Sequence, residues 1–489
     1  MAAPIALVAF WVTGCTVGPR YHPPAPPTVS TYTPAPPEKT VNTNGPSGTS
    51  QHFDASAQLP AQWWELFHSP QLNAMVSEAL ANSPSLAQAT ARLSQAQEEL
   101  RARSGATRFP TVTGSASVEQ KQVNLAAFGV PFPNPSPFTL LNGSVAISYA
   151  LDIFGGNRRQ IEALRAQIDY QQWQLEGARL MLAGNVVSAA IRQAKLQQQI
   201  EITRQLLAAE RQQTAIIEQR RAAGGATELE IHRQQTVVAQ TQATIPALQQ
   251  QLDAVNDQLA VLMGKSPAEA QVQSISLDSL QLPQDLPVSL PSSLARQRPD
   301  IRAAEALLHR ASAEVGVATA NLYPQIVLSG NGGSVGTSFT SGGDIWNVGA
   351  GLTQPIFNGG ALRAEKRKAI AAYDEAGSAY KQTFLTAFQQ VADTLYAIQH
   401  DAEALQASDQ AASEAAAAYS IASDRYRAGG ISQLALLDAE RQQLQTALDR
   451  TASAASRYAD SATLFEALGG GWWNQPSNSA PSVQAENAP

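Results

Sequence analysis

Cysteine is almost absent from this chain of 489 residues, which contains a single one, Cys15. One cysteine excludes an intramolecular disulfide and cannot supply the cysteine clusters that hold structural zinc. The six histidines are scattered, no Ser/His/Asp set converges, and no glycine-rich phosphate-binding loop follows a predicted strand. The sequence therefore predicts no enzyme, no catalytic residue, no metal site and no cofactor other than a covalent lipid, which is discussed below.

Positive charge and long apolar runs are scarce as well. There are 33 Lys and Arg against 40 Asp and Glu, a net charge of −7, which gives no reason to expect binding to nucleic acid. Beyond the first residues, no stretch approaches the ~18 uninterrupted apolar residues of a membrane-spanning helix. If this chain crosses a membrane, it must do so as a closed barrel of strands.

The chain begins with a short apolar segment. Residues 5–12 are apolar and lead into Thr13, Gly14 and Cys15, with no Lys or Arg ahead of them. A short apolar run that ends in small residues is typical of a secretory signal, and a cysteine directly after it is typical of a bacterial lipobox. We expect a lipoprotein signal peptide over residues 1–14 and a covalent lipid such as palmitate on Cys15. The alternative is a signal peptide with an incidental cysteine.

An internal duplication organises the body of the chain. Segments 220–236 and 425–441 both contain Ala-Gly-Gly between two helical patterns, and they lie about 205 residues apart. Glycine permits the positive φ that ends a helix, and Thr227 and Ser432 are placed to cap the helix that follows. Each segment is therefore predicted to be the tip of a long helical hairpin.

The predicted domains follow from this duplication and from composition. Residues 19–50 are rich in Pro, Thr, Ser, Asn and Gly, which is typical of an extended linker. The divisions are the signal peptide at 1–14, a lipid-anchored extended tether at 15–58, half 1 at 59–266, an equatorial connector at 267–298, half 2 at 299–471 and a low-complexity tail at 472–489. Each half is expected to contain a helix, a strand pair and a long helical hairpin.

Four segments alternate apolar and small polar residues, as strands do: 111–120, 142–152, 325–331 and 345–353. Their lengths approach the ~9–11 residues of a tilted membrane strand. Four strands cannot close a barrel, and about eight make one that its own side chains fill. Three chains would supply twelve strands around an open lumen, so the pattern favours a trimer. A soluble antiparallel sheet is the alternative.

The hairpin helices carry apolar residues every seven positions. The first helix has Ile161, Ile168, Leu175, Leu182, Ala189 and Leu196, and the second hairpin has Phe384, Val391, Ile398, Leu405, Ala412, Tyr419 and Tyr426. A sustained period of 3.5 predicts coiled-coil packing. A helix from Gly156 to Arg221 would be roughly 100 Å long, far more than a compact domain needs.

These features together resemble the outer-membrane factors of tripartite efflux systems, the TolC-like family, in its lipid-anchored NodT/OprM-like branch. They are the lipobox, the duplicated unit, PIFNGG at 355–360 and RYRAGG followed by LALLDAER at 425–441. The resemblance covers nearly all of the chain from Cys15 to Gly471. It implies a mainly α fold with membrane β: a trimeric 12-stranded β-barrel in the bacterial outer membrane, continuous with a long 12-helix α-barrel in the periplasm.

The resemblance also implies a function and its partners. The homotrimer would be the gated exit duct through which drugs and toxic compounds leave the periplasm, together with a periplasmic adaptor protein and an inner-membrane pump of RND type. Two alternatives stay open at this point. A type I protein-secretion duct has the same architecture, and a structural coiled-coil lipoprotein would have no pore.

The site residues implied by the resemblance lie near the hairpin tips. They form three groups: a periplasmic gate of Leu434, Asp438 and Arg441; gate-supporting links at Tyr426 and Glu230; and adaptor contacts at Gly224, Gly225, Gly429 and Gly430. Three like side chains around a threefold axis would form a ring that excludes water or captures cations. The alternative for Asp438 and Arg441 is an ordinary i,i+3 pair on a helix surface.

Overall fold

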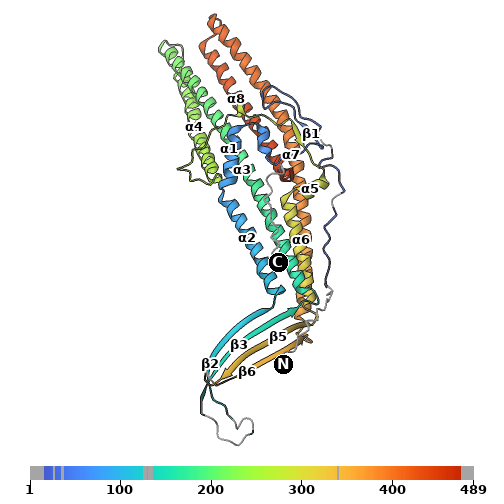
Figure 1. Cartoon of the computed structure of the whole chain (residues 1–489). Coiled ribbons are helices and arrows are strands. Elements are labelled where there is room, and N and C mark those ends of the chain that lie inside the picture. The colour runs from blue at the N-terminus through green and yellow to red at the C-terminus, as the bar shows by residue number, and fades with distance from the viewer. Residues whose placement is uncertain are drawn as a thin grey trace. The chain divides into compact units, whose positions relative to one another are not determined.

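The computed structural model describes residues 16–25, 28–34, 38–124, 129, 136–338 and 341–474 (Figure 1). The chain divides into two compact units, and each unit draws on both halves of the sequence. The first unit contains residues 16–24, 91–172 and 303–381, and the second unit contains the other described residues. The predicted signal peptide, Cys15 and residues 475–489 lie outside the described residues.

The order of elements repeats along the chain. The first series is α2 (Pro84–Arg108), β2 (Thr111–Lys121), β3 (Phe138–Leu151), α3 (Gly156–Ala222) and α4 (Glu228–Leu262). The second is α6 (Pro299–Ala320), β5 (Gln325–Gly336), β6 (Gly342–Thr353), α7 (Ala361–Arg427) and α8 (Gln433–Ala467). Helices α3 and α7 both have 67 residues, and α4 and α8 both have 35. These equal lengths support a duplication, while the exact ends of its two halves stay a prediction.

Shorter elements lie around these series. They are β1 (His52–Asp54), α1 (Pro70–Asn82), β4 (Asp285–Pro287), α5 (Pro291–Gln297) and 3-10 turns at Trp63–Phe67, Leu277–Ser279 and Trp472–Asn474. In the described part of the chain, no helix is both long enough and apolar enough to cross a membrane.

In the first unit, four strands form one antiparallel sheet in the order β2-β3-β5-β6. The register places Val112, Ile147, Gly330 and Val348 in one row, and residues directly opposite one another share a face. The alternating apolar residues of all four strands therefore lie on one face of the sheet. This face carries Val112, Val118, Val145, Ile147, Tyr149, Leu151, Ile326, Leu328, Trp346, Val348 and Leu352. The opposite face carries Thr111, Thr113, Ser115, Ser144, Ser148, Ser329, Asn331, Asn347 and Thr353.

The strands of the second pair are longer than the predicted segments 325–331 and 345–353. Strand β5 continues to Gly336 and β6 begins at Gly342. The reason is a close approach of backbones, since a Cβ at Gly333 would collide with Gly143 and Ser144 of β3. Glycine here lets the strands pair closely instead of ending them.

In the second unit, an aromatic cluster forms part of the core. Trp63 and Phe465 have ring centroids 5.7 Å apart, and the hydroxyl of buried Tyr458 donates to the Leu280 carbonyl at 2.9 Å. Trp472 packs on Trp173 at 4.9 Å and donates its indole N–H to the Gln297 carbonyl at 2.7 Å. These contacts hold Trp472, the first residue of the predicted tail, on the body, while the bounds of the predicted tail stay a prediction.

The predicted tether is also bound to the body, at least in its described residues. Strand β1 pairs in parallel with β4. The guanidinium of Arg457, a residue only 1% exposed, donates to the Ser47 and Thr49 carbonyls at 2.8 and 3.2 Å and to Gln51 Oε1 at 3.0 Å. A segment poor in apolar residues can thus be fixed through its backbone carbonyls, which composition alone does not reveal.

Candidate functional site

The two hairpin tips, both in the second unit, are built alike. Gly224 and Gly429 have φ values of +77° and +74°, the left-handed conformation that stops a helix. The N–H of the next glycine then donates back to the last helical turn, from Gly225 to the Arg220 carbonyl and from Gly430 to the Arg425 carbonyl, both at 2.7 Å. The local hairpin predicted from Ala-Gly-Gly is therefore present twice (Figure 1).

The caps of the two return helices differ. Thr227 Oγ1 accepts from the Glu230 N–H at 3.3 Å, and the Glu230 carboxylate accepts from the Thr227 N–H at 2.6 Å, which completes a capping box. The bonds from the Thr227 backbone and hydroxyl lower the pKa of Glu230. In the second hairpin Ser432 caps α8, but the residue three positions later is Ala435, whose side chain cannot return the bond.

The predicted gate residues lie on the first turns of α8. Leu434 is half-buried, while the guanidinium of Arg441 donates to Asp438 Oδ1 at 3.1 Å. The two side chains are 42% and 67% exposed, so within one chain this is a solvated i,i+3 pair worth a few tenths of a kcal/mol. Their role as a gate stays a prediction.

The predicted links are not joined to each other within one chain. Tyr426 donates its hydroxyl to Gln433 Oε1 at 3.3 Å, across the tip of its own hairpin. Glu230 is held by Thr227 in the other hairpin. Both residues lie at the tips, as predicted, and their role as links stays a prediction.

Sequence reasoning missed Glu210, a buried acid on α3. The residue is 3% exposed, and its Oε2 has no hydrogen-bond partner. Burial raises the pKa of the Glu210 carboxyl, and the Thr241 hydroxyl and the charge of Arg441 act in the opposite direction. The signal was present in the seven-residue pattern, which continues from Leu196 through Thr203 and Glu210 to Ile217, all buried. Because the charge of Arg441 acts on Glu210, the first hairpin interacts electrostatically with a predicted gate residue of the second.

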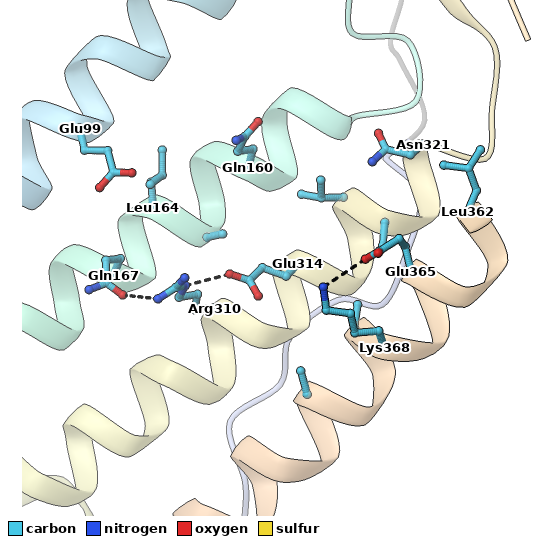
Figure 2. Close-up of a pocket in the computed structure, with 15 residues that line it drawn as sticks. Glu99, Gln160, Leu164, Gln167, Arg310, Glu314, Asn321, Leu362, Glu365 and Lys368 are labelled. Atoms are coloured by element: carbon cyan, nitrogen blue, oxygen red, sulfur yellow. Dashed lines mark hydrogen bonds and ion pairs between the residues drawn. The ribbon is translucent and has the colours of Figure 1, made fainter. Parts of the chain in front are cut away.

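The first unit contains a cleft of about 630 Å³ between α2, α3, α6 and α7 (Figure 2). Its wall mixes apolar and polar residues, and four of its charged side chains form ion pairs while Glu99 forms none that the structure records. Arg310 donates to Glu314 at 2.9 Å and to Gln167 at 2.8 Å, and Lys368 pairs with Glu365 at 3.4 Å. The two ion pairs neutralise most of the charge on this wall.

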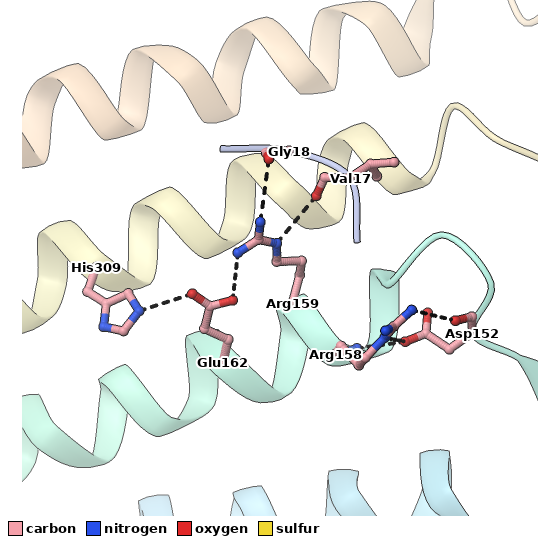
Figure 3. A network of polar contacts seen from close by, with 7 residues as sticks. All are labelled: Val17, Gly18, Asp152, Arg158, Arg159, Glu162 and His309. Carbon is pink, nitrogen blue, oxygen red and sulfur yellow. Dashed lines mark hydrogen bonds and ion pairs between the residues drawn. The ribbon is translucent and has the colours of Figure 1, made fainter. Parts of the chain in front are cut away.

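A polar network in the same unit holds the first described residues of the chain (Figure 3). Arg159 donates to the Val17 carbonyl at 3.3 Å, the Gly18 carbonyl at 3.4 Å and Glu162 at 2.8 Å. The other oxygen of Glu162 lies 3.1 Å from His309 Nε2, and Tyr21 stacks on His309 at 4.3 Å. The residues that follow Cys15 are therefore fixed on α3 and α6.

Among the residues that the structure describes, no group of three or more His, Cys, Asp or Glu side chains is arranged to hold a metal ion.

Comparison with known proteins places this architecture among channels. The sequence profile of a family described as "Outer membrane efflux protein" matches residues 75–265 and 290–470. The pyoverdine export outer membrane protein OpmQ of Pseudomonas putida is 32% identical over 448 residues, covering 90% of this chain and 94% of OpmQ. The cation efflux system protein CusC of Escherichia coli is 29% identical over 473 residues, covering 95% and 97%.

Solved structures show the same similarity. The outer-membrane channel OprN superposes with a TM-score of 0.81 at 30% sequence identity, covering 94% of this chain and 100% of the OprN chain. The similarity therefore extends over both halves of the duplication and over both the sheet and the hairpins.

Proposed function

Because this chain belongs to the outer membrane efflux protein family, we propose that three copies of it form the exit duct of a tripartite efflux pump. A protein of this family is a channel component of the outer membrane and not an enzyme. The proposal adds the trimer, its partners, its gate and its anchor. A periplasmic adaptor would hold the hairpin tips at Gly224, Gly225, Gly429 and Gly430, and an inner-membrane pump, of RND type, would supply energy.

The observation that carries the proposal is the two-faced sheet with β2 and β6 at its edges. Its apolar face is uncovered in one chain, with Trp346 and Val348 79% and 81% exposed, while its other face carries mainly hydroxyl and amide groups, with Val327 and Ile345 among them. A membrane-spanning wall around water needs this division. Three sheets of four strands closed edge to edge would satisfy every edge and leave a lumen.

The anchor of the proposed duct is a lipid on Cys15. Thr16, the next residue, lies beside Gly155 in the turn between β3 and α3, where a Cβ on that glycine would meet Thr16. A lipid on Cys15 would therefore start close to the end of a membrane strand. It would add an anchor to the barrel without needing a flexible tether.

The gate of the proposed duct is formed by Leu434, Asp438 and Arg441, supported by Tyr426 and Glu230. Three copies of an exposed carboxylate and guanidinium near one axis would close the lumen by mutual pairing. An adaptor that binds the separated tips more tightly than the closed tips would shift the population toward the open state.

The cargo is proposed to be small molecules. Relatives are named for export of pyoverdine, antibiotics, toluene and cations, and a wide, water-filled lumen would select weakly among such compounds. This reasoning favours small-molecule efflux over protein secretion.

Conductance in planar lipid bilayers tests the duct and its gate. The purified protein should conduct as a trimer, and Asp438→Ala with Arg441→Ala should raise the single-channel conductance. The chain offers a matched control, because Arg427 pairs with Asp424 on α7 at the same 3.1 Å and both are exposed. Asp424→Ala with Arg427→Ala should leave conductance unchanged. Equal effects of the two double variants would place the gate elsewhere, and absence of conductance from a folded trimer would refute the duct.

A further inference from the structure

The same Ile-Phe pair occurs after β3 and after β6, and the structure covers only one of them. Ile153 and Phe154 follow β3 and are half-buried. Ile356 and Phe357 follow β6 and are 97% and 90% exposed. Two adjacent large apolar residues so fully exposed at the end of an edge strand indicate a missing partner.

The covered pair shows what that partner looks like. Phe154 stacks on Tyr323, with ring centroids 4.7 Å apart and planes at 19°. Tyr323 directly precedes Pro324 and β5, the strand that pairs with β3. The stack thus closes the end of the ladder where half 1 meets half 2.

The duplication identifies the equivalent of Tyr323 in the first half. Tyr323 and Pro324 precede β5 as Phe109 and Pro110 precede β2. Phe109 is 67% exposed and stands beside the other edge strand of the sheet. Phe109 and Phe357 therefore correspond to Tyr323 and Phe154, the two members of the covered stack, and both are exposed.

We propose that β6 of one copy pairs with β2 of the next copy in the register that β3 and β5 use within the chain, with Phe357 stacked on Phe109 of the next copy. The inference rests on the proposed trimer and specifies how its membrane wall is joined. A head-to-tail contact of this kind closes into a ring when the same interface is used at each step. The contact between the halves inside a chain is then reused between chains.

The register follows residue by residue. Ala150 lies opposite Val327 and Ser148 opposite Ser329 in the β3–β5 ladder. If Phe154 is aligned with Phe357, then Thr353 is the equivalent of Ala150. If Tyr323 is aligned with Phe109, then Thr113 is the equivalent of Val327. Thr353 should therefore face Thr113 of the next copy. Under the same alignment the two hairpins differ by two residues, because Thr111 lies opposite Ser148 whereas Gln325 lies opposite Thr353 and not Gly351. The competing register therefore places Thr353 opposite Ser115 of the next copy.

The transferred register agrees with the chemistry of the two faces. Thr353 and Thr113 both lie on the polar face of the sheet. Leu352 would lie opposite Gly114 of the next copy, and both belong to the apolar face. A shift by one residue would place apolar side chains on the polar face, so only even shifts compete with this register.

Disulfide trapping tests the register, since directly opposite strand residues are close enough to bridge. The mature lipoprotein carrying Thr113→Cys and Thr353→Cys should form covalent dimers and trimers on oxidation with copper phenanthroline. The pair Ser117→Cys and Thr353→Cys, two rows further along the same face, should not. Ala150→Cys with Val327→Cys is the positive control, because it reproduces the same juxtaposition inside one chain.

The stack is tested separately by alanine substitution. Phe357→Ala and Phe109→Ala should each lower the temperature at which the detergent-resistant trimer dissociates, and the double variant should lower it no further than the larger single effect. Phe154→Ala combined with Phe109→Ala should instead be additive, since these residues belong to different stacks.

The outcomes separate this inference from the function on which it rests. Trimers that conduct but crosslink only through Ser117→Cys with Thr353→Cys, or through neither pair while the positive control crosslinks, would overturn the register and leave the duct intact. Additive effects of Phe109→Ala and Phe357→Ala would overturn the stack. A protein that remains monomeric in lipid would refute the trimer itself.

Discussion

Replacing the buried acid on α3 should stabilise the first hairpin. Glu210 occupies a core position of the seven-residue pattern and is 3% exposed. Burial raises the pKa of the Glu210 carboxyl, so the folded hairpin bears a cost for holding it ionised. Exchange of buried charge for an apolar side chain of similar size typically stabilises by ~1–4 kcal/mol. The attraction to half-exposed Arg441 that Glu210→Leu removes is worth about 1 kcal/mol or less.

The net gain for Glu210→Leu is therefore about 1–3 kcal/mol in the local opening of the hairpin. Because 1.4 kcal/mol corresponds to a factor of ten, amide hydrogen exchange around residues 206–217 should slow by roughly 5- to 150-fold. Exchange measured by mass spectrometry on the purified protein gives this factor. Glu218→Leu, at an exposed position of the same helix, is the control and should change exchange by less than about threefold.

Faster exchange in Glu210→Leu would refute this reasoning. It would mean that Glu210 and Arg441 stabilise the hairpins as a pair, and that the charge is retained because it is well compensated. With Glu210→Gln, the same experiment across pH separates the two cases. The wild-type hairpin should lose protection as pH rises through the raised pKa of Glu210, and the glutamine variant should not.

Three further predictions concern other parts of the chain. Arg457→Met should destabilise the second unit by about 3–5 kcal/mol, because it leaves buried acceptors without a donor, and protease should then cleave within residues 38–54. Gly429→Ala should cost roughly 1–2 kcal/mol at the tip, measured by hydrogen exchange, whereas Gly430→Ala, at a position without positive φ, should cost less. Burial raises the pKa of Glu466 to about 7, so the folded state holds a proton that the unfolded chain releases. Thermal stability should thus fall as pH rises from about 4.5 to 7 and level off above, and Glu466→Gln should remove that slope. An unchanged slope in Glu466→Gln, equal costs at the two glycines, or an intact segment 38–54 would each contradict its prediction.

The family and fold class were predictable from the sequence, and both are confirmed by the family profile and by the structural likeness to OprN. Helix ends depend on neighbouring residues alone, so Gly224, Thr227, Gly429 and Ser432 sufficed to place both tips. Strand alternation is equally local. It assigned an apolar and a polar side to each strand before any pairing was known.

Pairing and burial had to come from the tertiary structure. The strand register gathers the apolar residues of four strands on one face, and it depends on strands up to about two hundred residues apart in the chain. The contacts of Gly333 with β3 join residues equally far apart. Arg457 binds a segment that composition marks as a linker, and Glu210, on the first hairpin, is buried and feels the charge of Arg441 on the second. Ile356 and Phe357 match Ile153 and Phe154 in sequence and differ only in what covers them. Local sequence determines what each element is, because backbone preferences act over a few residues; which surfaces remain exposed is decided only when distant elements meet.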